Sequence, residues 1–369
     1  MTSAVRIAIA IVVFAAASAR AQQPAPIARA QTPTPPFPYR VEEVTFESAP
    51  GVRLAGTLTI PPGEGPFPAV VLVSGSGPHD RNGGGGTWTP SWVIADRLAR
   101  HGVAALRYDK RGVAQSSGSF ATATILDFAA DAEAAVRFLR QRPRIAPDRV
   151  GIAGHSEGGV VAPIVTARTR DVAFVVLIAA PGLPGDSTML LQRAATLRSD
   201  GVNPDTDRDL AVNRRAFAAI RAAHDSADAA ARLRALQTEV VAERPPAERD
   251  ALSQRLERGR AMLLTPWWRH FSTYDPRPAL RQIRVPVLAL TGSLDVQAPA
   301  DQNLAEIAAA LDAGGNRDHH VVAVPGVNHL LQRAKTGSPA EYDTLPDIVA
   351  PVVLELITNW VVARARAPR

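Results

Sequence analysis

The chain contains no cysteine in its 369 residues. This absence excludes disulfide bonds, thiolate metal sites and a lipid-attachment cysteine. Aromatic residues are also scarce, at 5%, so a core must be built mainly from Ala, Val, Leu and Ile. Hydrophobic residues still make up 46% of the chain, which is enough for one large core with an insertion. We expect a folded protein that tolerates an oxidising compartment without using disulfides.

Concentrated charge is missing as well. The formal net charge is +6, and no block of five like charges occurs. Nucleic-acid binding therefore has little support, and the spread excess of arginine allows only a mild attraction to anionic envelopes or substrates. No His, Asp or Glu cluster has metal-ligand spacing, and the glycine run 83–86 lacks the Gly-Lys-Ser/Thr of a phosphate loop. We predict no metal and no cofactor.

The first residues have the pattern of a secretory signal peptide. Arg6 precedes an uncharged apolar run over 7–17, and residues 19–21 form an A-x-A cleavage site. The run is too short for a stable membrane span. We predict a signal peptide over 1–21, cleavage after Ala21, and a secreted or periplasmic protein. A cytoplasmic chain with an amphipathic start is the alternative.

The rest of the chain has the pattern of an α/β protein. Residues 22–39 hold six prolines and predict an extended, mobile linker. Beyond it, strand-like segments alternate with helical ones, which predicts a doubly wound, mostly parallel sheet. Two antiparallel edge strands are expected first, and a final helix near 346–363 is expected to cover one face. The expected strands are 41–46, 54–60, 68–73, 103–108, 149–153, 172–179, 285–291 and 320–324.

A helical insertion interrupts this pattern. Apolar residues recur at helical spacing between 182 and 275, in the usual place for a lid over such a sheet. We therefore divide the α/β core into 40–181 and 276–369, with a helical lid over 182–275. Trp267 and Trp268 near its end are candidates for lining an acyl or aromatic pocket. The alternative is that they pin the lid to the core.

The most informative motif is the G-x-S-x-G run GHSEG at 154–158. It lies between an apolar segment and a helical one, which is the context of a nucleophile elbow. Such a sharp strand-to-helix turn needs small residues on both sides of the nucleophile, and a strained backbone at the nucleophile itself. We predict that Ser156 is a nucleophilic serine. A plain glycine-rich turn is the alternative.

A serine nucleophile needs a base and a group that orients the base. His329 follows the strand expected at 320–324 and lies on a loop, so it is the expected general base. Asp295 follows the strand expected at 285–291, at the carboxyl end where α/β sheets hold their ligands. Asp301 and Asp312 are alternatives to Asp295, but they fall in or after the next helix.

An oxyanion hole is expected from two backbone N–H groups. The strand at 68–73 runs into a loop of small residues, SGSGP, where a substrate can approach bare backbone. In this arrangement the donors follow the third strand and the nucleophile. We expect them at Ser76, or at Gly75 if the loop is shifted by one, and at Glu157. Gly75 and His79 are further candidates for the substrate pocket.

These motifs together resemble the α/β-hydrolase superfamily over roughly residues 40–363. Within it, the chain resembles bacterial secreted carboxylesterases of the serine-aminopeptidase-like or dienelactone-hydrolase-like kind. The segments YDKRG at 108–112 and PWWR at 266–269 fit that group. One departure is Val113-Ala114, where such proteins often carry a further glycine; we expect it to change loop shape only. The order Ser156, Asp295, His329 is that of α/β-hydrolases.

The expected activity is cleavage of carboxylic esters through an acyl-enzyme. The same triad could serve an aminopeptidase or amidase, although no acidic cluster for gripping a free amino terminus is evident in the sequence. It could also serve an acyltransferase, if an alcohol or amine acceptor entered better than water. A non-catalytic envelope-binding module is the alternative from another class. The sequence does not define the natural substrate or the oligomeric state.

Overall fold

The computed structural model describes residues 29–366 and has one eight-stranded sheet at its centre. Across the sheet the strands follow the order β1-β2-β4-β3-β5-β6-β7-β8. The pairs β1/β2 and β2/β4 are antiparallel and all others are parallel. The expected mostly parallel sheet with an antiparallel start is confirmed. The strands are β1 (Arg40–Ala49), β2 (Val52–Ile60), β3 (Phe67–Val73), β4 (Ala104–Tyr108), β5 (Ile145–His155), β6 (Val175–Ile178), β7 (Val287–Gly292) and β8 (His319–Val324).

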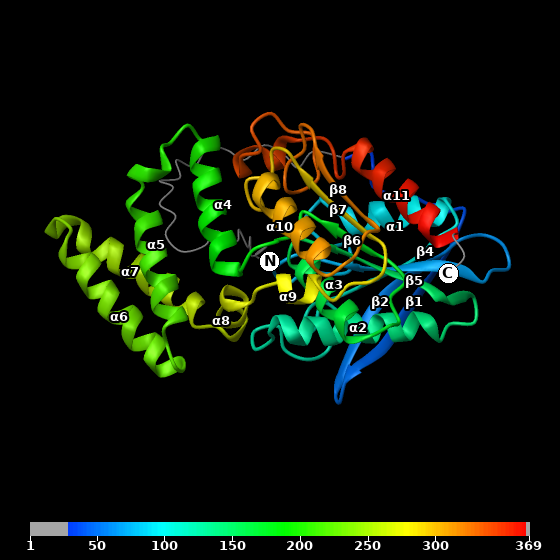
Figure 1. Cartoon of the computed structure of the whole chain (residues 1–369), viewed down its shortest axis with the longest axis horizontal. Coiled ribbons are helices and arrows are strands. Elements are labelled where there is room, and N and C mark those ends of the chain that lie inside the picture. Colours follow the sequence, from blue (N-terminus) through cyan, green and yellow to red (C-terminus); the bar gives the residue numbers. More distant parts are fainter. Residues whose placement is uncertain (1–28, 367–369) are drawn as a thin grey trace, which may run out of the picture.

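Helices cover both faces of the sheet (Figure 1). Successive side chains of a strand point to opposite faces, so Val70 and Leu72 of β3 join one apolar layer while Val71 and Val73 join the other. The first layer is closed by α1 and α11, and the second by α2, α3 and α10. The bounds of these helices are α1 (Pro90–Arg100), α2 (Ile125–Arg140), α3 (Glu157–Arg168), α10 (Ala300–Ala313) and α11 (Pro351–Arg366).

Several elements differ from the expected bounds, and strand β5, expected over 149–153, extends from Ile145 to His155. The final helix begins at Pro351 rather than near 346, because a proline suits the first helical position, where no N–H is needed. Upstream of it, the Asp347 carboxylate accepts hydrogen bonds from Arg333 in a loop. Strand β6 is shorter than the expected 172–179, and the positive φ of 48° at Ala179 marks where the extended backbone stops.

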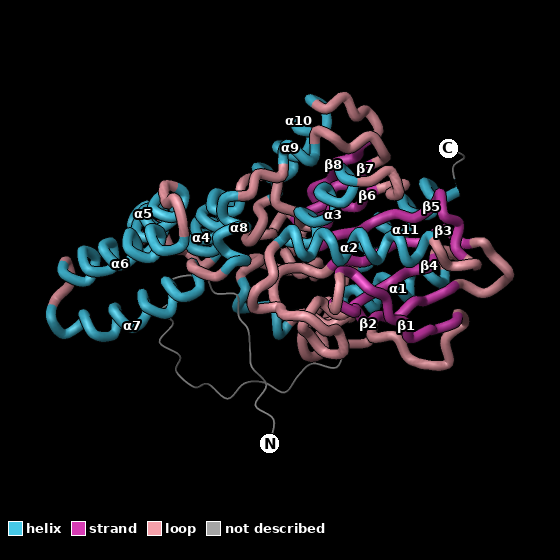
Figure 2. The backbone as a smooth tube through the Cα atoms, turned by 90° about the horizontal axis from the view of Figure 1, so that it is seen from below, coloured by secondary structure: helices cyan, strands magenta, loops and turns pink. Residues whose placement is uncertain are grey.

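Between β6 and β7 the chain leaves the sheet and forms five helices. They are α4 (Gly185–Ser199), α5 (Arg208–Arg221), α6 (Ser226–Ala242), α7 (Pro246–Leu263) and α8 (Pro266–Thr273), with a 3-10 turn η1 (Pro204–Thr206) after α4. The short α9 (Arg277–Leu280) then leads into β7. Both ribbon views place α5, α6 and α7 to one side of the sheet, with α6 and α7 farthest from it (Figures 1 and 2).

The described part of the expected linker, residues 29–39, is held against the domain. The buried Arg29 donates to the carbonyl of Asp347, and Gln31 bonds the backbone of Val349 in both directions. The Tyr39 hydroxyl donates to Asp96 of α1 at 2.7 Å. This segment is therefore anchored, not a free linker, because its polar side chains have partners on the domain. The expected signal peptide, 1–21, lies outside the described residues.

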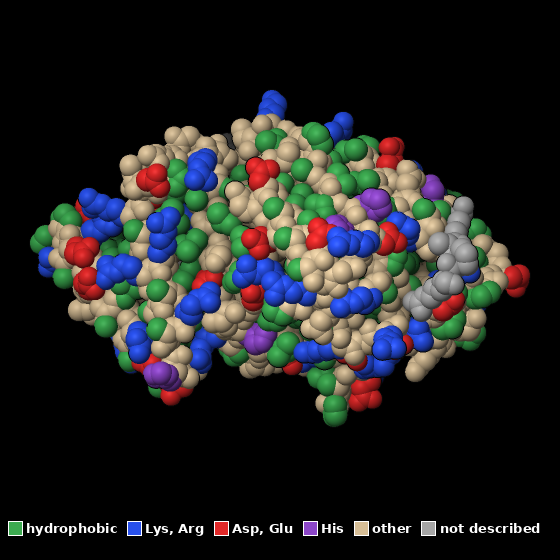
Figure 3. Space-filling view, in the orientation of Figure 1, with side chains coloured by type: hydrophobic (Ala, Val, Ile, Leu, Met, Phe, Trp, Pro, Cys, Tyr) green, Lys and Arg blue, Asp and Glu red, His purple; other side chains and the backbone are tan. Residues whose placement is uncertain are grey.

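Charge is mixed over the face of the molecule shown in Figure 3. Lys and Arg side chains lie among Asp and Glu side chains there, without a patch of one sign. Many of these charges are paired. Arg277 pairs with Glu306 of α10 beside the sheet, and Arg215 pairs with Glu239 within the helices between β6 and β7. Over residues 29–366, no helix combines the length and the apolar character needed to cross a bilayer.

Candidate active site

Ser156 occupies a sharp turn between β5 and α3. Its φ is +54°, a left-handed value that a non-glycine residue seldom adopts. A Cβ on Gly154 would lie 1.9 Å from the carbonyl oxygen of Gly158, and a Cβ on Gly158 would lie 2.3 Å from that of Val73. The strand, the helix and β3 thus approach too closely for any side chain at these two glycines. This steric requirement accounts for the G-x-S-x-G pattern.

The structure brings Ser156, His329 and Asp295 together at the carboxyl ends of the strands. His329 lies on the loop after β8, and Asp295 on the turn after β7. The His329 Nε2 atom is 3.2 Å from the Ser156 hydroxyl oxygen. The His329 Nδ1 atom is 2.9 Å and 3.1 Å from the two carboxylate oxygens of Asp295. The three side chains form one hydrogen-bonded chain.

The Asp295 carboxylate is held in place by burial and by backbone N–H groups. Asp295 and His329 are each only 4% exposed. One Asp295 oxygen also accepts from the backbone N–H groups of Gln297 and Ala298, both at 2.8 Å. With the carboxylate held in this way, the imidazole donates from Nδ1 and leaves Nε2 free to accept the serine proton.

A buried amide pair supports the loop that carries the histidine. Asn328 and Gln332 are fully buried and bond each other through both side chains and backbone. Asn328 N–H also donates to the Gln332 carbonyl at 2.9 Å. Gln332 reaches on to the carbonyl of Asp347 at 3.0 Å. Sequence reasoning missed this pair, and its only signal was an Asn-His step followed by a polar residue in an apolar stretch.

The other histidines near the site are kept neutral by burial. Burial first, and then the neighbouring His329, lowers the pKa of His155 to about 3. The His155 Nε2–H donates to the His329 carbonyl at 3.0 Å, so this ring packs against the base. Burial and Lys110 lower the pKa of His79 to about 4. His319 and His320 begin β8, at the opposite end from Ser156.

The two expected oxyanion donors belong to segments next to the nucleophile, the loop after β3 and the first residue of α3. Gly75 approaches so closely that a Cβ there would be 3.3 Å from the Ser156 Cβ. Within residues 29–366, the backbone N–H groups of Ser76 and Glu157 have no acceptor in the protein. His79, a candidate for substrate contact, donates from Nε2 to the Ser76 carbonyl at 2.6 Å. This bond therefore ties His79 to the loop that follows β3.

The Glu157 side chain is buried in an ion pair beside the elbow. It is 1% exposed and pairs with Lys110 at 2.6 Å. Its second carboxylate oxygen accepts a hydrogen bond from the Trp267 indole of α8. A carboxylate so close to the elbow is stable only with such partners, because an unpaired buried charge is costly.

The two tryptophans of α8 separate into different roles. Trp267 is partly buried, bonds Glu157 and stacks on Phe271 with ring centroids 5.1 Å apart. Trp268 is fully buried and packs against Phe217 of α5 at 5.4 Å. The surroundings of Trp268 are those of a core residue. Its environment therefore favours the alternative that it pins the insertion to the core over the hypothesis that it lines a pocket. The acids Asp301 and Asp312 lie exposed on α10 and are not part of the hydrogen-bonded chain of Ser156, His329 and Asp295.

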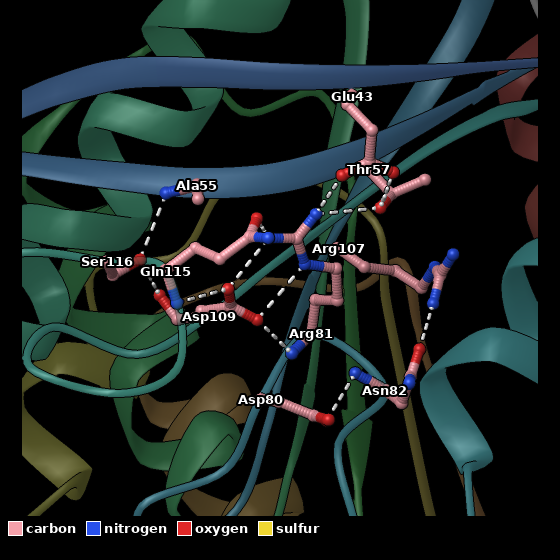
Figure 4. Close-up of polar contacts among 10 residues, drawn as sticks. All are labelled: Glu43, Ala55, Thr57, Asp80, Arg81, Asn82, Arg107, Asp109, Gln115 and Ser116. Carbon is pink, nitrogen blue, oxygen red and sulfur yellow. Dashed lines mark hydrogen bonds and ion pairs between the residues drawn. The ribbon is translucent and has the colours of Figure 1, made fainter.

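Three consecutive residues after β4, Asp109, Lys110 and Arg111, form ion pairs with three different segments around the site. Asp109 is bonded by Arg81, which also reaches Glu43 of β1 (Figure 4). Lys110 bonds Glu157, and Arg111 pairs with Asp127 and Asp131 of α2. Burial alone would raise the pKa of Asp109, but the hydrogen bonds from Arg81 hold it below the ordinary value. These ion pairs anchor loops and helices around the elbow.

No group of three or more His, Asp or Glu side chains within residues 29–366 is arranged to hold a metal ion. The polar groups beside the elbow are the Ser156 hydroxyl, the His329 imidazole, the Asp295 carboxylate and the backbone amides of Ser76 and Glu157.

Comparison with known families places these residues in context. The family model described as X-Pro dipeptidyl-peptidase (S15 family) matches residues 50–326. The match contains Ser156 and Asp295 and ends just before His329. Esterase EstD of Thermotoga maritima is 37% identical over 139 residues, which cover 37% of this chain and 32% of that protein. The uncharacterised protein YfhR of Escherichia coli O157:H7 is 27% identical over 144 residues, 38% of this chain and 48% of its own length. This chain thus matches less than half of each relative.

Solved structures share the fold over most of the chain. The 2,6-dihydroxy-pseudo-oxynicotine hydrolase superposes with a TM-score of 0.53 at 16% identity, over 89% of this chain and 68% of that one. The α/β-hydrolase GrgF from Penicillium has a TM-score of 0.53 at 18% identity, over 89% and 98%. These neighbours confirm the α/β-hydrolase fold.

Proposed function

Because the chain belongs to the X-Pro dipeptidyl-peptidase (S15) family of α/β-hydrolases, we propose that it is a serine hydrolase that cleaves carboxylic esters. The single observation that carries this proposal is the hydrogen-bonded chain from the Ser156 hydroxyl through His329 to Asp295. Nucleophile, base and orienting acid lie within direct reach of one another, as acyl transfer requires.

The proposed mechanism begins with proton transfer. His329 Nε2 takes the Ser156 proton as the oxygen attacks the ester carbonyl, and Asp295 stabilises the imidazolium that forms. The tetrahedral intermediate collapses, His329 returns the proton to the alcohol, and an acyl-enzyme remains. Water then repeats these steps and releases the acid. The backbone N–H groups of Ser76 and Glu157 would hold the negative oxygen, and each such donor contributes about 3–4 kcal/mol.

The family description supports a peptidase as the second candidate. A dipeptidyl-peptidase has to bind a free amino terminus, for which a carboxylate near the nucleophile is the natural partner. Glu157 is the acid next to Ser156, and both of its oxygens are already engaged by Lys110 and Trp267. This occupation favours esters over peptides with free amino termini.

The remaining alternatives concern the acceptor and the place of action. An acyltransferase would use the same acyl-enzyme, and product ratios with an added alcohol or amine would identify it. A binding module without catalysis would not be labelled by a fluorophosphonate. Residues 1–21 lead us to propose secretion or a periplasmic location, which N-terminal sequencing of the exported protein would test.

The direct test is Ser156→Ala on a short p-nitrophenyl ester. Removing the nucleophile should lower kcat by about 10⁴-fold or more, since the base then has nothing to activate. Ser253→Ala on α7, remote from the elbow, is the matched control and should keep normal kinetics. Thermal unfolding of both variants checks that the fold is intact. Retained hydrolysis by folded Ser156→Ala would overturn the proposal.

A further inference from the structure

Lys110 is one of only two lysines among the 41 basic residues of the chain, the other being Lys335. Lys335 is exposed, whereas the Lys110 side chain is 4% exposed. Arginine takes every other basic position, so a compact ammonium group at position 110 stands out. Neither the triad nor the expected oxyanion donors include this residue.

The Lys110 ammonium has a complete set of partners. Its Nζ atom donates to the Gly75 carbonyl at 2.7 Å and to a Glu157 carboxylate oxygen at 2.6 Å. Its remaining side faces the aromatic rings of Phe128 at 4.3 Å and Phe120 at 5.7 Å. An arginine guanidinium group is larger and planar. It fits less well than an ammonium group into a position between one carbonyl, one carboxylate and an aromatic ring.

The bond to Gly75 sets the direction of an amide that the mechanism uses. The Gly75 carbonyl and the Ser76 N–H belong to one peptide group, which is trans because the cis bonds among the described residues lie at Pro36 and Pro66. In a trans peptide the C=O and the N–H point in opposite directions. Holding the carbonyl toward Lys110 therefore turns the Ser76 N–H away from Lys110.

The second partner of Lys110 carries the other donor. Glu157 supplies its backbone N–H at the start of α3, while its side chain pairs with Lys110 on one oxygen and Trp267 on the other. One buried ion pair thus joins the loop after β3 to the elbow after β5. The α8 indole closes the same cluster from the insertion.

We propose that Lys110 is a positioning residue of the oxyanion hole, one that aims the Ser76 N–H by holding the Gly75 carbonyl and is itself held by Glu157. This inference rests on the proposed serine hydrolase function. Lys110 does not touch the substrate. Because Lys110 fixes the loop after β3 in advance, the loop does not have to rearrange when negative charge develops on the substrate oxygen. Preorganised donors lower the activation barrier in this way.

The test compares Lys110→Met with the double variant Lys110→Met/Glu157→Gln. Lys110→Met leaves a buried carboxylate without its cation, so it should lose both stability and activity. The double variant is neutral at both positions and should recover much of the melting temperature. If Lys110 aims the amide, kcat of the double variant should stay about 10²-fold low while KM changes less than about threefold. Recovery of normal kcat with normal stability would overturn the proposal and assign Lys110 a purely structural role.

Two further measurements keep the outcomes separate. Lys335→Met removes the other lysine from the surface and should keep wild-type kinetics. A boronic acid that forms a tetrahedral adduct should bind the double variant about 10²-fold more weakly, because it needs the same donors as the transition state. Normal boronic acid affinity in the double variant would contradict the proposal. Failure of fluorophosphonate to label Ser156 in the wild-type protein would instead contradict the proposed function itself.

Discussion

The sheet domain and the helical insertion differ in how tightly their own residues pack. Every residue of β6 and β7 is buried, and the two apolar layers of the sheet enclose these strands completely. In the insertion, α6 buries only Ala229, Leu233 and Val240 along its whole length. A cavity of about 30 Å³ remains between α5, α6 and α7. The sheet thus has little tolerance for change, whereas the outer helices have room to adjust.

The difference bears on where the chemistry is located. Ser156, Asp295 and His329, the proposed nucleophile, acid and base, all follow sheet strands, so the rigid part positions them. The insertion approaches this group through α8, where the Trp267 indole bonds Glu157. Helices α6 and α7 lie farther out (Figure 2). We infer that the site depends strongly on the sheet and on α8, and weakly on the outer helices. Three experiments can break or sharpen this distinction.

The largest effect is expected at Gly154 in the elbow. In Gly154→Ala the new Cβ would lie 1.9 Å from the Gly158 carbonyl, so β5 and α3 must separate. A shift of about 1 Å at the nucleophile is expected to cost about 10²-fold in kcat. Ester hydrolysis and thermal unfolding measure the two consequences. Gly85→Ala is the control, because a Cβ there meets no atom within 4 Å. Normal kinetics in Gly154→Ala would mean that the elbow is as adaptable as the outer helices.

A cavity in each region gives the second test. Leu177→Ala in β6, at 1% exposure, should cost about 2–5 kcal/mol of unfolding free energy, because the packed sheet relaxes little. Leu233→Ala in α6 enlarges the existing gap and should cost about 2 kcal/mol at most, since the helices can close in. Hydrogen exchange should rise only in α5–α7 for the second variant. Equal global destabilisation, with a matching loss of kcat/KM, would remove the proposed independence of the outer helices.

The elbow could be predicted from sequence because its requirement is local. Two glycines flanking a serine meet a steric demand that acts over five residues, and the strand and helix on either side are visible as apolar patterns. The convergence of Asp295 and His329 on Ser156 was predictable for a related reason, since each follows a strand whose carboxyl end must face the elbow. The parallel topology itself supplies that convergence.

What escaped prediction depends on contacts between distant segments. Lys110 and Glu157 meet across two strand ends, and nothing beside either residue indicates the pairing. The anchoring of Arg29 to the carbonyl of Asp347 joins the start of the described chain to the loop before α11 and has no local pattern either. Trp268 could not be separated from Trp267 by sequence, because neighbouring residues on a helix differ only in the side of the helix they face.

The smallest effect is expected in the acid sensitivity of the sheet domain. Burial, together with His329, lowers the pKa of His155 to about 3, against about 6.5 in the unfolded chain. Between these values the unfolded state binds a proton that the folded state does not, so stability falls as the pH drops from 6.5 toward 3. His155→Gln removes this term while an amide N–H can still donate to the His329 carbonyl. The variant should lose about 1–2 kcal/mol less than the wild-type protein between pH 7.5 and 4.5, the ring being only partly buried.

Denaturant unfolding at the two pH values, with hydrogen exchange at pH 4.5, measures this difference and its location. Protons taken up at His155 act on the loop after β8, so the protection that the variant regains should lie around β8 and the elbow rather than in α5–α7. The sign is diagnostic, because a histidine that is charged in the folded state would make the variant lose more stability in acid, not less. Identical acid sensitivity in both proteins would show that His155 is protonated as readily in the fold as outside it, and the sheet domain would then owe its acid response to other groups.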